Sequence, residues 1–180
     1  MFRHFALAAI AAFGFSTAVL ARDLTPEESA ALTAKVAAHE SLLHAKDAGG
    51  VIDDFPPGVL SFIAKMTSME EPAARQQGID TMMAAAEGAS FDAYDIDLDN
   101  ASEVYALEDG TEYVLLPTTM IELPGDGTKV KDEVTIAVLV DGAWYLIGFD
   151  NPDEAQLLIA AVPAFADPNF LANFNAALAE

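Results

Sequence analysis

The chain has 180 residues, a formal net charge of −21 and no cysteine. This length suits one domain of ~100–200 residues, and the missing cysteines exclude disulfides, thiol catalysis and thiolate metal sites. Because such an acidic surface repels the phosphate groups of nucleic acids and of anionic membranes, we expect neither as a partner.

The N-terminal segment has the pattern of a secretory signal peptide. Arg3 and His4 precede an apolar run from Phe5 to Phe15, and small or β-branched residues lead to an expected cleavage site after Ala21. The apolar run is shorter than the ~20 residues that a membrane-spanning helix needs. We therefore predict that residues 1–21 are a signal peptide and that the mature protein is periplasmic or secreted, with no membrane span.

The first part of the mature chain is typical of a long helix. Thr25-Pro26-Glu27-Glu28 is a capping box with proline at the first helical position, and it begins a helix that runs to about Asp47. Gly49 and Gly50 are expected to end this helix. One stripe along it consists of Leu32, Val36, His39 and Leu43.

Two further helices are expected before residue 90. Residues 51–57 are predicted to be a connector, and the apolar residues between 59 and 66 indicate a short helix. Ser68-Met69-Glu70-Glu71 is a second capping box, whose helix is expected to end near Gly88.

From Ser90 onward the apolar residues recur at every second position, which predicts strands. The expected strands are 91–99, 103–107, 112–123, 129–140 and 143–149. Pro117 lies inside the longest run and predicts a bulge or an edge there. Helical segments are expected again over residues 151–159 and 167–178.

The Asp141-Gly142 turn predicts a two-residue hairpin. The pairing that follows from this turn shows which residues share each face of the sheet, and both faces are apolar. The expected pairs on one face are Val140–Ala143, Val138–Tyr145, Ile136–Ile147 and Val134–Phe149. We expect helices to cover this face. The opposite face, with Leu139, Trp144 and Leu146, is apolar too, so either the C-terminal helix or a second copy of the protein must cover it. These three residues are the candidate interface, and a homodimer is the candidate assembly.

The predicted fold class is α+β: N-terminal helices packed on a curved antiparallel sheet of four to five strands, followed by a C-terminal helical segment. We expect residues 22–180 to form one domain, with a core over 25–162 and a helical tail over 167–179. This order of elements resembles the nuclear-transport-factor-two-like or cystatin-like cone, in which a curved sheet wraps a helix and leaves a pocket.

A more local likeness covers roughly residues 51 to 165. Three segments, Phe55-Pro56-Pro57 through Met66, residues 114–119 and residues 144–147, look like exported bacterial cone-fold proteins of unknown function. The resemblance implies a fold and a compartment, and it assigns no catalytic residue.

Two patterns that suggest metal sites fail on spacing. His39 and His44 are five residues apart, so they diverge by about 140° around a helix, whereas a zinc-protease helix separates its histidines by four. The acidic run from Asp95 to Asp99 begins like a calcium loop, but Asn100 and Ala106 stand where glycine and glutamate are needed. We expect neither a metal nor a cofactor.

His39 is the most interesting ionisable residue because it lies on the apolar stripe. It can be a general base or a ligand donor at a pocket, or a core histidine satisfied by one hydrogen bond. Asp53 and Asp54 have two interpretations as well. Ketosteroid-isomerase-like members of the cone fold combine pocket carboxylates with a tyrosine, for which Tyr94, Tyr105, Tyr113 and Tyr145 are the candidates here. A helix cap at Asp54 explains the same residues.

The leading functional hypothesis is an exported, non-enzymatic binding or protein-interaction module. A small apolar ligand would contact His39, Phe62, Ile136, Tyr145 and Ile147; a protein partner or second copy would contact the candidate interface. The alternative is a small pocket enzyme of isomerase or hydrolase type, with His39 or a pocket carboxylate as base. No residue is assigned as catalytic under the leading hypothesis.

Overall fold

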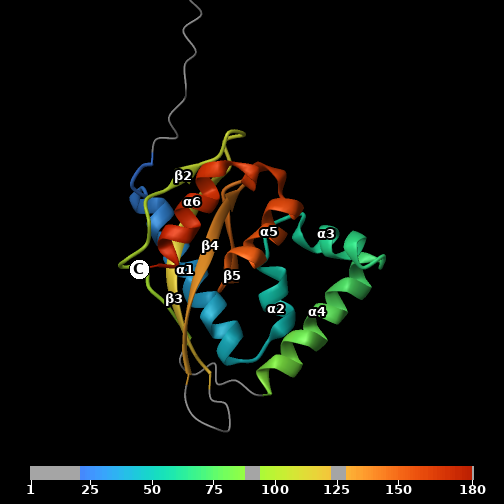
Figure 1. Cartoon of the computed structure of the whole chain (residues 1–180). Coiled ribbons are helices and arrows are strands. Elements are labelled where there is room, and N and C mark those ends of the chain that lie inside the picture. Colours follow the sequence, from blue (N-terminus) through green and yellow to red (C-terminus); the bar gives the residue numbers. More distant parts are fainter. Residues whose placement is uncertain (1–20, 88–93, 123–128, 180) are drawn as a thin grey trace, which may run out of the picture.

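The structure is a computed structural model of the chain, in which residues 21–87, 94–122 and 129–179 are described. The expected signal peptide falls almost entirely on residues 1–20, outside the described residues, as does the start of the strand expected over 91–99. The elements follow in the order α1 (Pro26–His44), α2 (Ala48–Asp53), α3 (Val59–Met66), α4 (Glu71–Ala86), β1 (Tyr94–Ile96), β2 (Tyr105–Ala106), β3 (Glu112–Glu122), β4 (Lys129–Val140), β5 (Ala143–Phe149), α5 (Pro152–Ala161), the 3-10 helix η2 (Pro163–Ala166) and α6 (Pro168–Ala177) (Figure 1).

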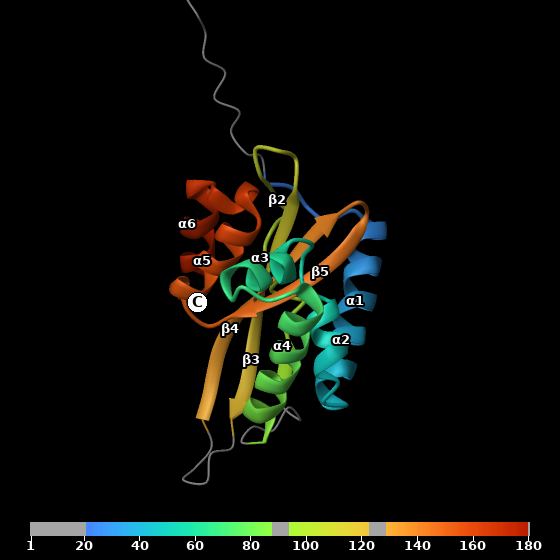
Figure 2. The ribbon, with the colours of Figure 1, turned by 90° about the vertical axis from the view of Figure 1, so that its right-hand side faces the viewer.

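The strands form one antiparallel sheet in the order β1-β3-β4-β5, with β2 also paired to β3. The sheet is curled, and helices pack on both of its sides (Figure 2). The predicted α+β class is therefore confirmed. The predicted hairpin register is also confirmed, because β4 and β5 pair Val140 with Ala143 and continue to Val134 with Phe149. Asp141 and Gly142 both have positive φ, as a type I′ turn requires.

Pro117 lies within a strand that is paired on both sides. The β3–β4 register runs without interruption from Glu112 to Glu122, so there is no bulge. On the other side of β3, β2 pairs with residues 112–113 and β1 with residues 118–120. Pro117 falls in the interval between these two short strands. Its carbonyl accepts from the backbone N–H of Asp97, and outside the regular pairing a residue without an N–H is tolerated.

Different helices cover the two faces of the sheet, and their assignment differs from the expectation. Helices α5 and α6 pack on the face of Val134, Ile136 and Val138, where Phe165, Phe170 and Phe174 are completely buried. Helix α1 packs on the opposite face, where its Leu32 and Val36 meet Ala137, Trp144 and Leu146. In Figure 2, α5 and α6 accordingly lie on one side of the sheet and α1 on the other. The covering element of the second face is α1, neither the C-terminal helix nor a second copy.

The N-terminal helices differ from the prediction at two of their boundaries. Helix α1 ends at His44, and Gly49 and Gly50 lie inside α2, which begins at Ala48 after the capping residue Asp47. A side chain at Gly50 would meet the Leu42 side chain at 2.5 Å, so this glycine permits close packing of α2 on α1 and does not end a helix. The second predicted capping box is wrong: α4 begins at Glu71, while Ser68 has a positive φ and makes no cap.

The stripe predicted on the first helix is confirmed, because the buried residues of α1 are Leu32, Val36, His39 and Leu43. Among the described residues, no helix has the length and apolar character needed to cross a membrane.

Candidate functional site

A cavity of about 390 Å³ lies beside the edge strand β5, and we call it the central cavity. Its walls come from the helices α1 to α5 and from the strands β1, β3, β4 and β5. Most of its lining side chains are apolar: Leu43, Val51, Phe55, Val59, Phe62, Ile63, Met82, Met120, Ile147, Phe149, Leu157 and Leu158. The polar lining side chains are those of His39, Tyr94, Glu133 and Glu154. A mostly apolar cavity with a few polar groups is the usual form of a small-molecule site.

His39 is held at the cavity by a carboxylate. Its Nδ1 lies 2.8 Å from Oδ2 of Asp54, and only 5% of His39 is exposed. Lys35, one helical turn before His39 on α1, donates from Nζ to the other oxygen of Asp54. In the neutral imidazole, a proton on Nδ1 that is donated to Asp54 leaves a lone pair on Nε2. Asp54 thus determines the orientation of the ring and which ring nitrogen is available to a ligand.

The position of Asp54 is determined by contacts on either side of α2. Its carbonyl accepts a hydrogen bond of 2.8 Å from the backbone N–H of Leu146, on the outer edge of β5. The neighbouring Asp53 carboxylate is bound through both oxygens by Arg75 of α4, at 2.7 and 2.8 Å. This hydrogen bonding lowers the pKa of Asp53. The two adjacent carboxylates therefore join α2 to α1 and to α4.

A group of three side-chain oxygens surrounds Gly148 on the floor of the central cavity. A Cβ atom at this position would lie 3.4 Å from Oε2 of Glu133, 3.5 Å from Oη of Tyr94 and 3.6 Å from Oγ1 of Thr135. Thr135 accepts a hydrogen bond from Thr118 at 2.8 Å. We call Glu133, Tyr94 and Thr135 the oxygen cluster. Because Gly148 has no side chain, the space beside the cluster stays part of the cavity.

The phenol of Tyr94 stays protonated over a wide pH range. Burial raises the pKa of Tyr94 to about 12, the hydrogen bond with Thr135 opposes this shift, and the negative charges of Glu133 and Glu40 add to it. The phenol oxygen lies 3.4 Å from Oγ1 of Thr135. Tyr94 therefore offers both a hydrogen to donate and a lone pair to accept at the cavity floor.

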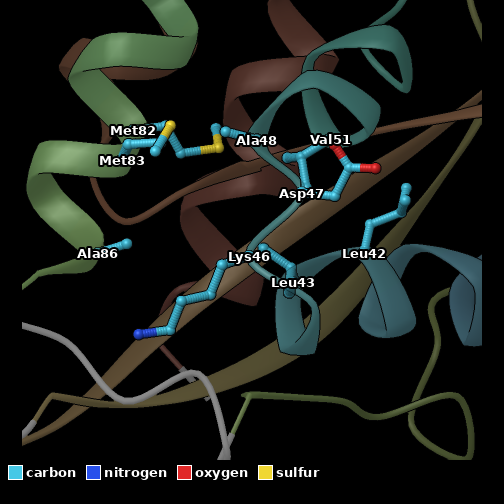
Figure 3. A pocket seen from close by; sticks show the side chains of 9 residues that line it. All are labelled: Leu42, Leu43, Lys46, Asp47, Ala48, Val51, Met82, Met83 and Ala86. Atoms are coloured by element: carbon cyan, nitrogen blue, oxygen red, sulfur yellow. The ribbon is translucent and has the colours of Figure 1, made fainter.

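Two further hollows adjoin the central cavity. A groove of about 700 Å³ between α3 and α4 shares Phe55, Ile63, Met82, Glu133 and Glu154 with it, and we call it the outer groove. A small hollow of about 20 Å³ lies between the end of α1, α2 and α4 (Figure 3). This hollow holds about one water molecule and is too small for an organic ligand, whereas the central cavity and the outer groove are large enough.

The structure brings together some of the predicted site residues and separates others. His39, Phe62 and Ile147 line the central cavity. Ile136 is completely buried in the core beneath α5 and α6, and Tyr145 is half-buried on β5 and does not line the cavity. Of the candidate interface, Trp144 is 5% exposed and Leu146 is completely buried beneath α1, while Leu139 packs at the border of that cluster.

Several cavity residues had no role in the sequence analysis. Tyr94 was weighed only as a partner for Asp53 or Asp54, and Glu133, Gly148 and Glu154 were not considered. A glycine within an apolar strand was the one available signal, because it often marks close approach of another group. The expected divergence of His39 and His44 is confirmed, since His44 is exposed and His39 buried.

The acidic run after β1 forms a turn in which Asp97 accepts hydrogen bonds from the backbone of Asp99 and Asn100. Within residues 21–87, 94–122 and 129–179, no three His, Cys, Asp or Glu side chains are placed to hold a metal ion. Comparison of the chain with protein-family models, with curated proteins and with solved structures finds no match. The central cavity is therefore the feature from which a function can be inferred.

Proposed function

We propose that the chain is an exported binding protein for a small, mainly apolar organic molecule, which the central cavity encloses. The observation that carries the proposal is the cavity of about 390 Å³ with apolar walls and the buried His39 at its border. This volume is within the range of roughly 300–1,000 Å³ typical of small-molecule sites. Export is proposed from the pattern of residues 1–21.

The hydrogen bond between Asp54 and His39 supports a specific role for the histidine in binding. Because Asp54 engages Nδ1, the ring can offer Nε2 to a hydroxyl or amide group of the ligand. The remaining walls supply apolar contact area, which is the main source of affinity for such a molecule.

Titration with the neutral fluorescent dye N-phenyl-1-naphthylamine tests the proposal. The Gly148→Val substitution adds a side chain to the cavity floor and should weaken dye binding by about tenfold or more, since it occupies part of the binding volume. Ala143→Val is the matched control, because Ala143 is an exposed residue of the same strand outside the cavity lining. A wild-type protein that binds no dye, or equal binding by both variants, would contradict the proposal.

Native mass spectrometry of the mature protein, purified from its exported compartment, adds the identity of the molecule. A discrete additional mass that Gly148→Val protein does not retain is the expected result. The mass then defines the chemical class of the ligand. Additional mass that persists in the Gly148→Val protein would place the retained molecule elsewhere.

A pocket enzyme with His39 as general base is the second candidate, and the Asp54–His39 hydrogen bond is the observation that favours it. A carboxylate at Nδ1 orients an imidazole for proton transfer at Nε2 in many hydrolases and isomerases. Incubation of the retained molecule with wild-type and His39→Gln protein separates the two candidates. A product formed only by the wild type supports catalysis, while an unchanged molecule in both samples supports binding alone.

A further inference from the structure

Acidic side chains line the central cavity and the outer groove, whereas basic ones do not. The carboxylates of Glu133 and Glu154 line both the central cavity and the outer groove, and neither hollow has a lysine or arginine among its lining residues. Lys131 has its Nζ 3.9 Å from Glu133 and also contacts Asp150, whose pKa it lowers by hydrogen bonding. Asp150 is also hydrogen-bonded to Glu154, so acidic side chains outnumber the one ammonium group among these described residues.

The oxygen cluster adds directional acceptors to this charge. The space beside Gly148 is bordered by Glu133, Tyr94 and Thr135, with the distances from the Cβ position between 3.4 and 3.6 Å. A carboxylate has about four lone-pair positions, so one carboxylate such as that of Glu133 can accept from several donors at once. An ammonium group has three donors and no acceptor, which makes it the complement of such a cluster.

The backbone of β5 directs a further acceptor toward the outer edge of the sheet. The N–H of Leu146 points away from β4, because it donates to Asp54. In an antiparallel strand the N–H and C=O of a residue point to the same side, and alternate residues repeat this direction. The carbonyl of Gly148, two residues after Leu146, is therefore also directed away from β4, at the edge where the cavity lies.

We propose that the ligand of the central cavity is an amphiphilic organic cation, with its ammonium group at the oxygen cluster and its apolar body against the cavity walls. This inference rests on the proposed function, since it specifies the ligand of that same cavity. It also excludes fatty acids and other anionic amphiphiles, whose head group would lose its hydration beside two carboxylates without gaining a cationic partner. The overall charge of −21 further favours the approach of a cation.

Isothermal titration with three probes of equal chain length tests the head-group preference. Octylammonium, octanol and octanoate differ at the head group and have the same apolar body. We expect octylammonium to bind about tenfold or more tightly than octanol, because a hydrogen bond to a charged group is stronger than a neutral one, and octanoate to bind weakest. Equal binding of octylammonium and octanol would overturn the inference while leaving the proposed function standing. If none of the three probes binds, the proposed function itself fails.

A charge-neutralising variant separates the oxygen cluster from the general acidity of the surface. Glu133→Gln should weaken octylammonium binding by about tenfold and leave octanol binding unchanged. Glu108→Gln is the matched control, because it removes the same charge from an exposed residue outside the lining of both hollows. Equal losses in the two variants would show a diffuse charge effect and would overturn the inference.

A second variant keeps the test decisive if Glu133→Gln does not fold. Gly148→Ala leaves every charge in place and adds one methyl group among the three oxygens, at ordinary contact distances. It should weaken octylammonium binding more than octanol binding, because the methyl group displaces the ammonium group from its acceptors. An unchanged preference for octylammonium in Gly148→Ala protein would place the cation elsewhere and overturn the inference.

Discussion

Replacing Asp54 by alanine removes the carboxylate that both Lys35 and His39 contact. The Asp54 side chain is 12% exposed and that of His39 is 6% exposed, so water cannot readily take the place of the lost partner at Nδ1. Lys35 is more exposed and can turn towards solvent. The backbone carbonyl that accepts from Leu146 is unchanged by the substitution.

The expected loss of stability follows from these two contacts. A hydrogen bond to a charged group contributes about 1.5–3 kcal/mol, and a buried polar group left without a partner costs about 1–3 kcal/mol. Because Lys35 regains hydration, His39 accounts for most of the loss. We expect Asp54→Ala to lower the free energy of unfolding by about 2–4 kcal/mol.

Asp53→Ala is the matched control for this prediction. It removes the same charge from the adjacent residue, but the Asp53 side chain is 61% exposed and its partner Arg75 is 35% exposed. Exposed ion pairs contribute about 0–1 kcal/mol, so we expect the control to lose less than about 1 kcal/mol.

Urea unfolding, followed by tryptophan fluorescence and linear extrapolation, measures both values. Trp144 is the only tryptophan of the sequence, and it is buried beneath α1, so its emission reports the separation of α1 from the sheet. A double-mutant cycle of Asp54→Ala with His39→Ala should give a coupling of about 1–3 kcal/mol. Equal losses for Asp54→Ala and Asp53→Ala, or a coupling near zero, would refute the assigned contact between Asp54 and His39.

Three further predictions concern other parts of the fold. Hydrogen bonding to Arg22 lowers the pKa of Glu28 from 4.5 to about 2. The wild type should therefore be more stable than Glu28→Gln at neutral pH, and acid unfolding curves should show this advantage disappearing as the pH falls from 4.5 towards 2. Burial raises the pKa of Tyr94 and of Tyr113 from 10.0 to about 12. Both phenols therefore stabilise the fold below pH 10.0 and lose this effect as the pH rises towards 12. In a tyrosinate absorbance titration, the Tyr94→Phe protein should lack one of the two tyrosines that ionise near pH 12. Phe170→Ala should cost about 3–5 kcal/mol in urea unfolding, because Phe170 is completely buried, and a loss below about 1 kcal/mol would contradict the packing of α6 on the sheet.

Local patterns in the sequence predicted the parts of the fold that depend on neighbouring residues. The buried stripe of α1 follows from a period of 3.6 residues, and the β4–β5 register follows from the two-residue turn at Asp141-Gly142. In both cases the residues that decide the structure lie within one element or one hairpin. Gly49 and Gly50 show the limit of such patterns, because a glycine pair permits close helix packing as readily as it ends a helix.

The apolar character of both sheet faces was evident from the alternation along β4 and β5, but the elements that cover them were not. Alternation states which residues share a face, and it contains no information on which distant helix packs there. Here α1 packs on the face of Trp144, while the aromatic residues of α6 pack on the opposite face. Which helix covers which face depends on the path of the connections and on side-chain shape.

The sequence by itself determined the helical stripe that contains His39, the hairpin register and the acidic character of the surface. Only the tertiary structure decided that Asp54, fifteen residues further along the chain, contacts His39. It also decided that Tyr94 of β1 meets Glu133 and Thr135 of β4 beside Gly148 of β5. A local pattern defines the direction of a side chain relative to its own element, whereas a site arises where several elements cross, and their crossing depends on the packing of the whole chain.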